Sequence, residues 1–320
     1  SSFDAHQDPR SLRYNPLLTV ELNINYRSHI DILALSNELF YENRLLSAAD
    51  PRDVDSLQDY RPHPINVGPP FPPPAAAMFN AAPRNIGFSS AVGNVGFNSA
   101  TRQSPLWVVG VNGQDAHDID SPSFFNSDEV DAVCSVVLDL LQSDVVSVSP
   151  ADFGVIAPYW RQVRKIRAAL RNLGLSTVRV GLVEDYQGQE ARITIVSMTL
   201  SRVRESLHSM SASNVSDGSG KGILGSAKGF NVATSRAKAL SVIVANPVAL
   251  EGDGFGRSLL LRSLRSNRYV GTPCSAAAVE EARLRREGSS GVGADGRPLV
   301  TNALDMVDHL GELAGQLAIE

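Results

Sequence analysis

Six short apolar runs, each the length of a β-strand, are spread along this chain of 320 residues. Most are continuous in Val, Ile and Leu, which is typical of strands that are covered on both faces. Segments of helical length lie between them, and such an alternation favours a parallel sheet flanked by helices. We therefore predict an α/β fold. The six runs are residues 17–22, 106–111, 153–157, 177–180, 193–198 and 241–245.

The clearest helix is expected directly after residue 126. Asn126 and Glu129 have the spacing of a capping box, in which each side chain bonds the backbone N–H of the other residue. Apolar residues then follow at helical spacing from Val130 to Leu141. Cys134 lies on that apolar stripe, so we predict a core residue rather than a catalytic thiol.

The composition limits the function classes. With 43% apolar and 20% charged residues the chain can bury a substantial core. No apolar run reaches the ~18 residues of a membrane span, and the polar start lacks the pattern of a signal peptide, so we expect a soluble protein of the cytoplasm or nucleus. The two cysteines and six histidines lack the close spacing of a zinc site. We therefore expect neither a structural metal nor a disulfide.

Charge is unevenly distributed along the chain. The formal net charge is −5, yet residues 151–250 hold 13 Lys and Arg against 6 Asp and Glu. Such a local excess can attract a phosphate backbone even in an acidic chain. A solvated basic face is the alternative interpretation.

Two regions depart from the strand and helix pattern. Residues 50–105 contain a proline-rich run at 69–74 and then Ala, Gly, Asn and Ser, so we predict a surface insertion, extended or disordered. A spacer is favoured there over a polyproline docking site. Residues 202–222 are expected to form a polar loop. Residues 276–320 contain helix-like pieces at 276–286 and 301–319, which we expect to form an appendage or a loosely attached tail.

Three constellations can carry chemistry. Tyr26 and Arg27 stand where a predicted helix begins, and there the arginine can reach phosphate and the tyrosine can stack on a base. They could equally be a packing residue and a surface charge. A second group, Gly188 with its polar neighbours Gln189 and Glu190, is suited to a ribose or a phosphate. A hydrolase with paired carboxylates is not favoured here, because no second acidic cluster accompanies the group.

Arg236 is the third candidate. It lies in a segment of mostly small residues, 230–238, that leads into the apolar run at 241–245. Such an arginine can stabilise the charge that develops on a transferring γ-phosphoryl group, as an arginine finger does. Capping a helix or pairing with Glu190 is the alternative.

The order and spacing of these elements resemble superfamily one helicases of the Upframeshift-like class, and especially the Armitage and Mov-ten RNA-silencing helicases. The second RecA-like domain of that family carries the elements NYRSH, SPSFFN, PY, VEEFQGQE and FNVAVTRAKALLIVVGNP. The resemblance covers residues 17–275 without the insertion. Here the matching segments are residues 25–29, 121–126, 158–159, 183–190 and 230–247.

The resemblance implies a RecA-like fold and a division of roles. Tyr26 and Arg27 would contact nucleotide, and Arg236 would be the arginine finger. Three residues of the second constellation would lie along the ribose and phosphates: Gly188, Gln189 and Glu190.

The resemblance also implies an RNA path. Pro158 and Tyr159 match a segment that approaches the RNA backbone at the start of a helix, where free N–H groups favour phosphate. The helix after them has a basic surface formed by Arg161, Arg164, Lys165, Arg167 and Arg171. One or two of these, Arg161 first, are expected to touch RNA.

The chain departs from the family pattern in several places. Leu182 stands where the family usually has a serine near the RNA, which weakens the expectation of a hydrogen bond there. Asp185, Tyr186 and Thr234-Ser235 are milder changes that leave Arg236 in place.

Two elements of a complete ATPase are absent from the sequence. No GxxxxGK[ST] phosphate loop and no acidic box for Mg²⁺ occur. In the family both belong to the first RecA-like domain, upstream of the point where this chain begins. The expected ATP and Mg²⁺ would thus be shared with that domain, and the chain alone is expected to be inactive.

The resulting hypothesis is the second RecA-like domain of an ATP-dependent RNA helicase, acting in RNA silencing or mRNA turnover. Expected partners are RNA, the upstream domain and silencing or decay proteins, in the cytoplasm or its ribonucleoprotein granules. Two alternatives stay open. One is a non-catalytic helicase remnant that serves as an RNA-binding or protein-interaction scaffold. The other is a DNA helicase of the same superfamily.

Overall fold

A six-stranded parallel sheet forms the centre of the computed structural model, which describes residues 22–62, 104–117, 123–143, 147–202 and 222–288. The strand order is β10-β3-β9-β8-β6-β7, and each neighbouring pair is parallel. The predicted α/β class is therefore confirmed. The strands are β3 (Leu106–Gly110), β6 (Phe153–Ala157), β7 (Arg179–Leu182), β8 (Ala191–Ser197), β9 (Ala237–Ala245) and β10 (Tyr269–Gly271).

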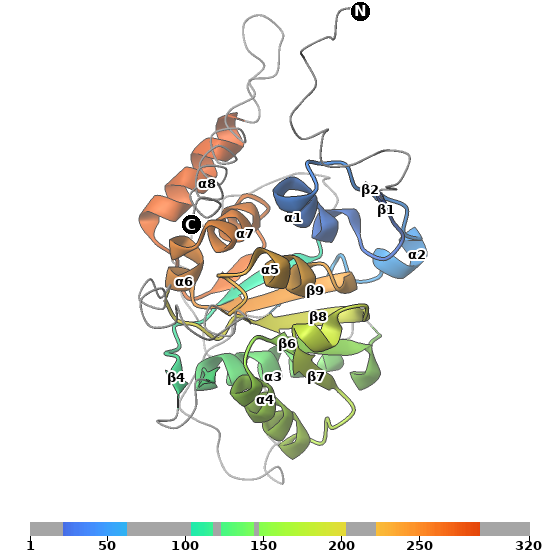
Figure 1. Cartoon of the computed structure of the whole chain (residues 1–320), viewed down its shortest axis with the longest axis vertical. Helices are drawn as coiled ribbons and strands as arrows, with labels where there is room; N and C mark the ends of the chain where they lie inside the picture. The colour runs from blue at the N-terminus through green and yellow to red at the C-terminus, as the bar shows by residue number, and fades with distance from the viewer. Residues whose placement is uncertain (1–21, 63–103, 118–122, 144–146, 203–221, 289–320) are drawn as a thin grey trace, which may run out of the picture.

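Helices cover both faces of this sheet (Figure 1). One layer consists of α3 (Ser127–Gln142) and α4 (Trp160–Asn172). The other contains α1 (Ile30–Phe40), α5 (Ala227–Thr234), α6 (Pro247–Gly252) and α7 (Gly254–Arg265). Each layer closes its own apolar core, and this is why the central strands show no polar alternation. The short elements are β1 (Ile24–Asn25), β2 (Leu46–Ser47), α2 (Pro51–Val54), β4 (Ala116–His117), β5 (Phe124–Phe125), η3 (Pro150–Asp152) and η4 (Glu184–Tyr186).

Five of the six predicted strands fall in this sheet. The run at 177–180 is displaced, because its strand is Arg179–Leu182. The run at 17–22 lies outside the described residues except for Leu22, which is not in a strand. The edge strand β10 was not predicted, since three residues are too short to give a periodic signal.

The predicted helix after residue 126 is present, but its capping box is only half formed. Asn126 Oδ1 accepts the N–H of Glu129 at 3.2 Å. The Glu129 carboxylate instead points into the domain and accepts from the Ser197 hydroxyl and the Thr199 N–H, at 2.6 and 2.8 Å. The Asn126 N–H is bonded to Gln162 Oε1 instead, so it does not need the glutamate.

Cys134 is fully buried on α3, as predicted for a core residue. Burial raises the pKa of its thiol to about 12. The reactive thiolate is therefore nearly absent at neutral pH.

Residues 51–60 of the expected insertion belong to the packed domain, which corrects the predicted boundary. Helix α2 begins after Asp50, whose side chain caps it. Three residues that follow are buried, Val54, Leu57 and Tyr60, and the Tyr60 carbonyl accepts from Trp107 Nε1 at 3.1 Å. Residues 63–103 lie outside the described residues.

The Tyr60 hydroxyl donates to Asp139 Oδ2 at 2.7 Å, joining this segment to α3. We expect Tyr60→Phe to lower the free energy of unfolding by about 1 to 2 kcal/mol, because a hydrogen bond to a carboxylate is lost. Urea unfolding measures the change. Tyr26→Phe is the control, since Tyr26 is 71% exposed, and equal stability of the two variants would contradict the prediction.

Helix α8 (Ala276–Gly288) confirms the first helix of the tail but is not loosely attached. Ala278 and Ala282 are buried, and Glu281 pairs with Arg257 of α7. The predicted helix at 301–319 and most of the polar loop at 202–222 lie outside the described residues. None of the described helices is long and apolar enough to cross a membrane.

Candidate functional site

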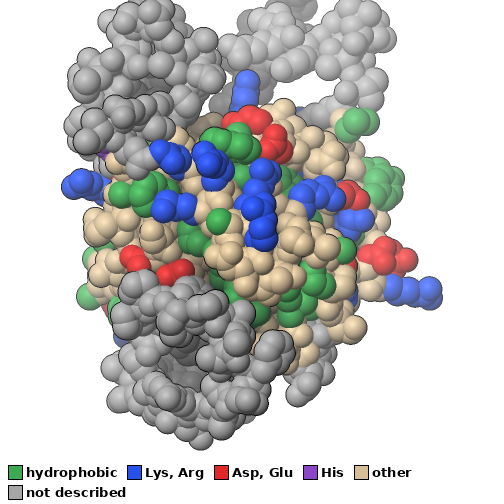
Figure 2. Space-filling model, turned by 90° about the horizontal axis from the view of Figure 1, so that it is seen from below, with side chains coloured by type: hydrophobic (Ala, Val, Ile, Leu, Met, Phe, Trp, Pro, Cys, Tyr) green, Lys and Arg blue, Asp and Glu red, His purple; other side chains and the backbone are tan. Residues whose placement is uncertain are grey.

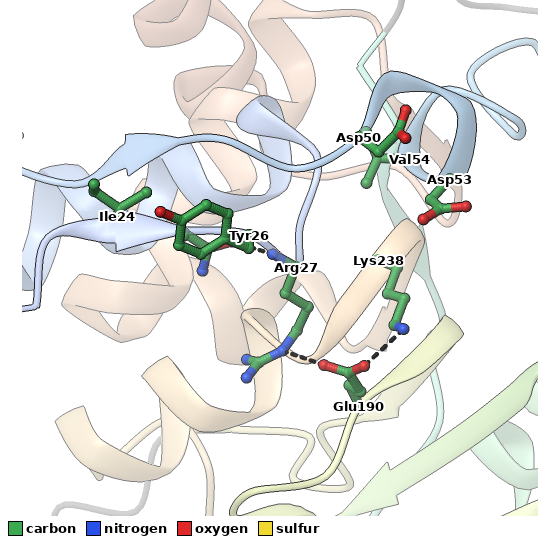
Figure 3. A pocket seen from close by; sticks show the side chains of 9 residues that line it. Ile24, Tyr26, Arg27, Asp50, Asp53, Val54, Glu190 and Lys238 are labelled. Atoms are coloured by element: carbon green, nitrogen blue, oxygen red, sulfur yellow. Dashed lines mark hydrogen bonds and ion pairs between the residues drawn. The ribbon is translucent and has the colours of Figure 1, made fainter.

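Strands β8 and β9 begin side by side, and a cluster of charged residues gathers at their amino ends. Glu190 directly precedes β8, and Arg236 directly precedes β9. Arg27 Nε donates to one carboxylate oxygen of Glu190 at 2.9 Å, and Lys238 Nζ contacts the other oxygen at 2.6 Å (Figure 3). The structure thus brings residues from three distant segments into one site.

The turn before α1 sets the position of Arg27. Asn25 Oδ1 accepts the N–H groups of Arg27 and Ser28 at 3.0 and 2.9 Å. The His29 N–H then donates to the Lys238 carbonyl at 2.9 Å, which ties this turn to β9. The His29 side chain is buried and caps α1. These hydrogen bonds therefore fix the backbone from which the Arg27 side chain extends.

The site has more positive charge than its own acidic group balances. Hydrogen bonds from Lys238 and Arg27 lower the pKa of Glu190, so this carboxylate is ionised at neutral pH. Burial, and then the nearby Arg27, lower the pKa of Arg236. Within the described residues, Arg236 Nε is buried and has no hydrogen-bond partner. A bound anion would satisfy that group.

A pocket of about 350 Å³ lies beside this cluster. Arg27 and Glu190 form one side of it, and Asp50 and Asp53 lie on the other (Figure 3). Because acidic groups repel phosphate, an anionic ligand would place its phosphates on the arginine side. The pocket lining is Ile24, Asn25, Tyr26, Arg27, Asp50, Asp53, Val54, Glu190 and Lys238.

The other residues predicted to bind nucleotide differ in how close they lie to the pocket. Tyr26 lines the pocket and is exposed. Gly188 has φ +76°, a conformation that favours glycine, and is exposed in the loop before β8. The Gln189 side chain accepts from Arg179 at 3.1 Å, in the direction of β7. Lys238 was missed by the sequence reasoning, although its place two residues after Arg236 puts both on one side of β9.

Pro158, Tyr159 and Arg161 lie at the opposite edge of the sheet, where β6 ends and α4 begins. The Tyr159 side chain is only 3% exposed and packs edge-on against Phe124. Its ring is therefore not accessible to RNA. The exposed aromatic residue is the next one, Trp160, which the sequence reasoning did not select.

The predicted basic surface of α4 is only partly available. Arg167 is half-buried, and its Nε donates to the Val180 carbonyl at 3.0 Å. Lys165 lies 4.0 Å from the centre of the Phe125 ring, and Arg164 and Arg171 are exposed. Figure 2 views the molecule from the side of α3 and α4 and shows Lys and Arg side chains gathered across this face. Helix α4 itself contains no acidic residue.

The parallel sheet, its two helical layers and the cation cluster at one edge define a RecA-like α/β domain. No group of three potential metal ligands occurs within the described residues. Residues 9–248 match the family model for the AAA domain, so the chain belongs to this family. This family match, together with the relatives named as helicases, confirms the helicase resemblance found in the sequence.

Several RNA helicases are similar to this chain. It is 34% identical to mouse RNA helicase Mov10l1 over 261 residues, which cover 81% of this chain and 18% of that protein. It is 33% identical to putative helicase mov-10-B.1 of Danio rerio, with 77% and 21% covered. For probable RNA helicase armi of Drosophila melanogaster the identity is 28%, with 84% and 19% covered. The chain spans about a fifth of the length of these curated relatives.

Proposed function

We propose that this chain is the second RecA-like domain of an ATP-dependent RNA helicase and supplies its arginine finger. The relatives named as RNA helicases give the class of reaction and substrate. One observation carries the assignment of the site: Arg236 presents a buried guanidinium nitrogen with no partner in the described part of the chain. A role in RNA silencing or mRNA turnover is proposed from the resemblance of the sequence to the RNA-silencing helicases.

The residues present fit the phosphate end of a nucleotide. Burial, and then the charge of the nearby Arg27, lower the pKa of Arg236, and Glu190 pairs with both Arg27 and Lys238. An anion between the two arginines would relieve their repulsion. Tyr26 has an exposed ring at the pocket, suitable for stacking on a base. These residues would bind and orient the nucleotide.

The proposed active site is shared with a P-loop domain. The Mg²⁺ ligands and the cradle for the β- and γ-phosphates would belong to that domain, because this sequence has no GxxxxGK[ST]. When the domains close, Arg236 would stabilise charge on the transferring phosphoryl group. The chain alone is then expected to bind ATP weakly without appreciable hydrolysis.

Arg27 provides a direct test of the nucleotide pocket. We expect Arg27→Ala to weaken ATP binding by the 320-residue chain about tenfold, because a charge-assisted contact to phosphate is removed. Calorimetric titration measures the affinity. Arg257→Ala is the control, since Arg257 pairs with Glu281 on α8 outside the pocket. Unchanged ATP affinity in Arg27→Ala would contradict the placement of phosphate here.

A further inference from the structure

We propose that Trp160 is a stacking platform for one base of single-stranded RNA, whose backbone follows the basic surface of α4. This inference rests on the proposed helicase function and deepens it by naming a base contact. The position is at the carboxyl end of β6, whereas the arginine cluster is at the amino ends of β8 and β9. RNA and nucleotide would thus occupy opposite edges of the sheet.

The exposure of Trp160 is the first observation. Trp160 is 48% exposed, whereas the neighbouring Tyr159 is buried against Phe124 and Leu200. Local apolar packing therefore uses the tyrosine and leaves the indole at the surface. An exposed tryptophan presents a flat apolar ring to a partner, and tryptophan is enriched at interfaces for that reason.

The second observation is that the indole is held in place. The Arg167 guanidinium carbon lies 5.3 Å from the centre of the Trp160 ring. Arg167 is itself anchored, since its Nε and one terminal nitrogen both donate to the Val180 carbonyl. A side chain fixed before binding loses little conformational entropy when a ligand arrives. Nearly half of the residue stays exposed and leaves room for a stacked base.

The charge on α4 indicates which kind of ligand binds beside Trp160. Arg164 and Arg171 are exposed on the same helix, and α4 has no acidic residue. A flat aromatic surface beside a basic track is the combination that binds single-stranded nucleic acid, in which bases stack and phosphates meet cations. An acidic peptide would need the cations but not the indole. The combination therefore favours a nucleic acid strand.

Intrinsic fluorescence of the 320-residue chain reports directly on this contact. The chain contains two tryptophans, and Trp107 is only 4% exposed. Titration with oligouridylate should quench the emission of the wild type, because a stacked base quenches an indole. Trp160→Phe should lose that quenching while keeping most of the affinity, since phenylalanine also stacks. Trp160→Ala should bind about tenfold more weakly, in the range found for single base-stacking contacts.

The salt dependence of RNA affinity distinguishes the stacking contact of Trp160 from the phosphate contacts of the basic residues. Trp160→Ala should keep the wild-type slope of log affinity against log salt, whereas Arg164→Gln should reduce the slope by about 0.7 for one lost phosphate contact. Circular dichroism of each variant checks the fold.

Three outcomes would overturn the inference. Wild-type affinity in Trp160→Ala together with unquenched wild-type emission would place the strand elsewhere. Binding of a polyglutamate peptide, weakened by Trp160→Ala, without binding of oligouridylate would assign the surface to a protein partner. Absence of any RNA binding would also contradict the proposed path of RNA along α4. The proposed nucleotide site is tested separately, by the ATP affinity of Arg27→Ala.

Discussion

Replacing Arg236 by lysine is expected to reduce RNA-stimulated ATP hydrolysis by the full-length helicase about a thousandfold or more. Arginine fingers contribute on that scale, because they stabilise charge that develops only in the transition state. Lysine keeps the charge but has no planar fork of donors to meet two phosphate oxygens. The guanidinium, whose buried Nε has no hydrogen-bond partner among the residues that the structure describes, is the group that would be lost.

The measurement compares kcat and KM for wild type, Arg236→Lys and Arg236→Ala in a protein that contains the P-loop domain. A loss in kcat with little change in KM is expected, because the contact is made in the transition state. Arg257→Lys is the matched control on the exposed side of α7. Near-normal kcat in Arg236→Lys would exclude the finger role. Hydrolysis by the isolated chain that Arg236→Ala abolishes would show that no second domain is needed.

Glu129→Gln is expected to stabilise the domain at alkaline pH by about 5 kcal/mol, because the raised pKa of the buried carboxyl group opposes its ionisation in the folded protein. Burial raises the pKa of Glu129 from its ordinary value of 4.5 to about 8, and Asp115 and Asp128 add to this effect. Its hydrogen bonds from Ser197 and Thr199 act in the opposite direction. The carboxyl group is therefore mostly protonated in the folded protein at neutral pH.

The direction in which stability changes with pH follows from proton binding to Glu129 in the folded and unfolded states. Between about pH 4.5 and 8 the folded protein holds a proton on Glu129 that the unfolded chain has lost. Stability attributable to this residue therefore falls as the pH rises through that range, and the full penalty is present above pH 8. Glutamine mimics the neutral acid and removes the penalty.

Urea unfolding of wild type and Glu129→Gln at pH 5, 7 and 9 measures the difference. The two curves should lie close together at pH 5 and separate at pH 9. Glu184→Gln changes an exposed carboxylate in η4 and should follow the wild type. A constant difference between Glu129→Gln and wild type across this range would contradict the raised pKa.

The failure to predict the orientation of Glu129 illustrates a limit of sequence spacing. Asn126 and Glu129 have capping-box spacing, and Asn126 does cap α3. The glutamate, however, finds the Ser197 hydroxyl and the Thr199 N–H, both about seventy residues away. Which of two hydrogen-bond sets a side chain adopts depends on groups that only the folded chain brings near.

Most residues of the arginine cluster, in contrast, were predicted from the sequence. Arg27, Glu190 and Arg236 were selected as ligand residues from three separate segments, and the structure places them together at one sheet edge. Parallel strands explain why Glu190 and Arg236 meet, because the amino ends of β8 and β9 lie along a single edge. The hydrogen bond from the His29 N–H to the Lys238 carbonyl brings Arg27 beside them. Lys238 was missed, since its spacing from Arg236 does not show that Glu190, its partner, lies nearby in the fold.

The parallel sheet, the helices that flank it and the resemblance to a helicase family were all predicted from the linear chain. These depend on local periodicity and on ordered motifs, which are properties of a linear chain. The burial of Tyr159, the exposure of Trp160 and the packing of residues 51–60 against the core became visible only in the folded protein. Burial of a side chain is set by neighbours distant in sequence, such as Phe124 and Leu200 around Tyr159, and no local pattern contains them.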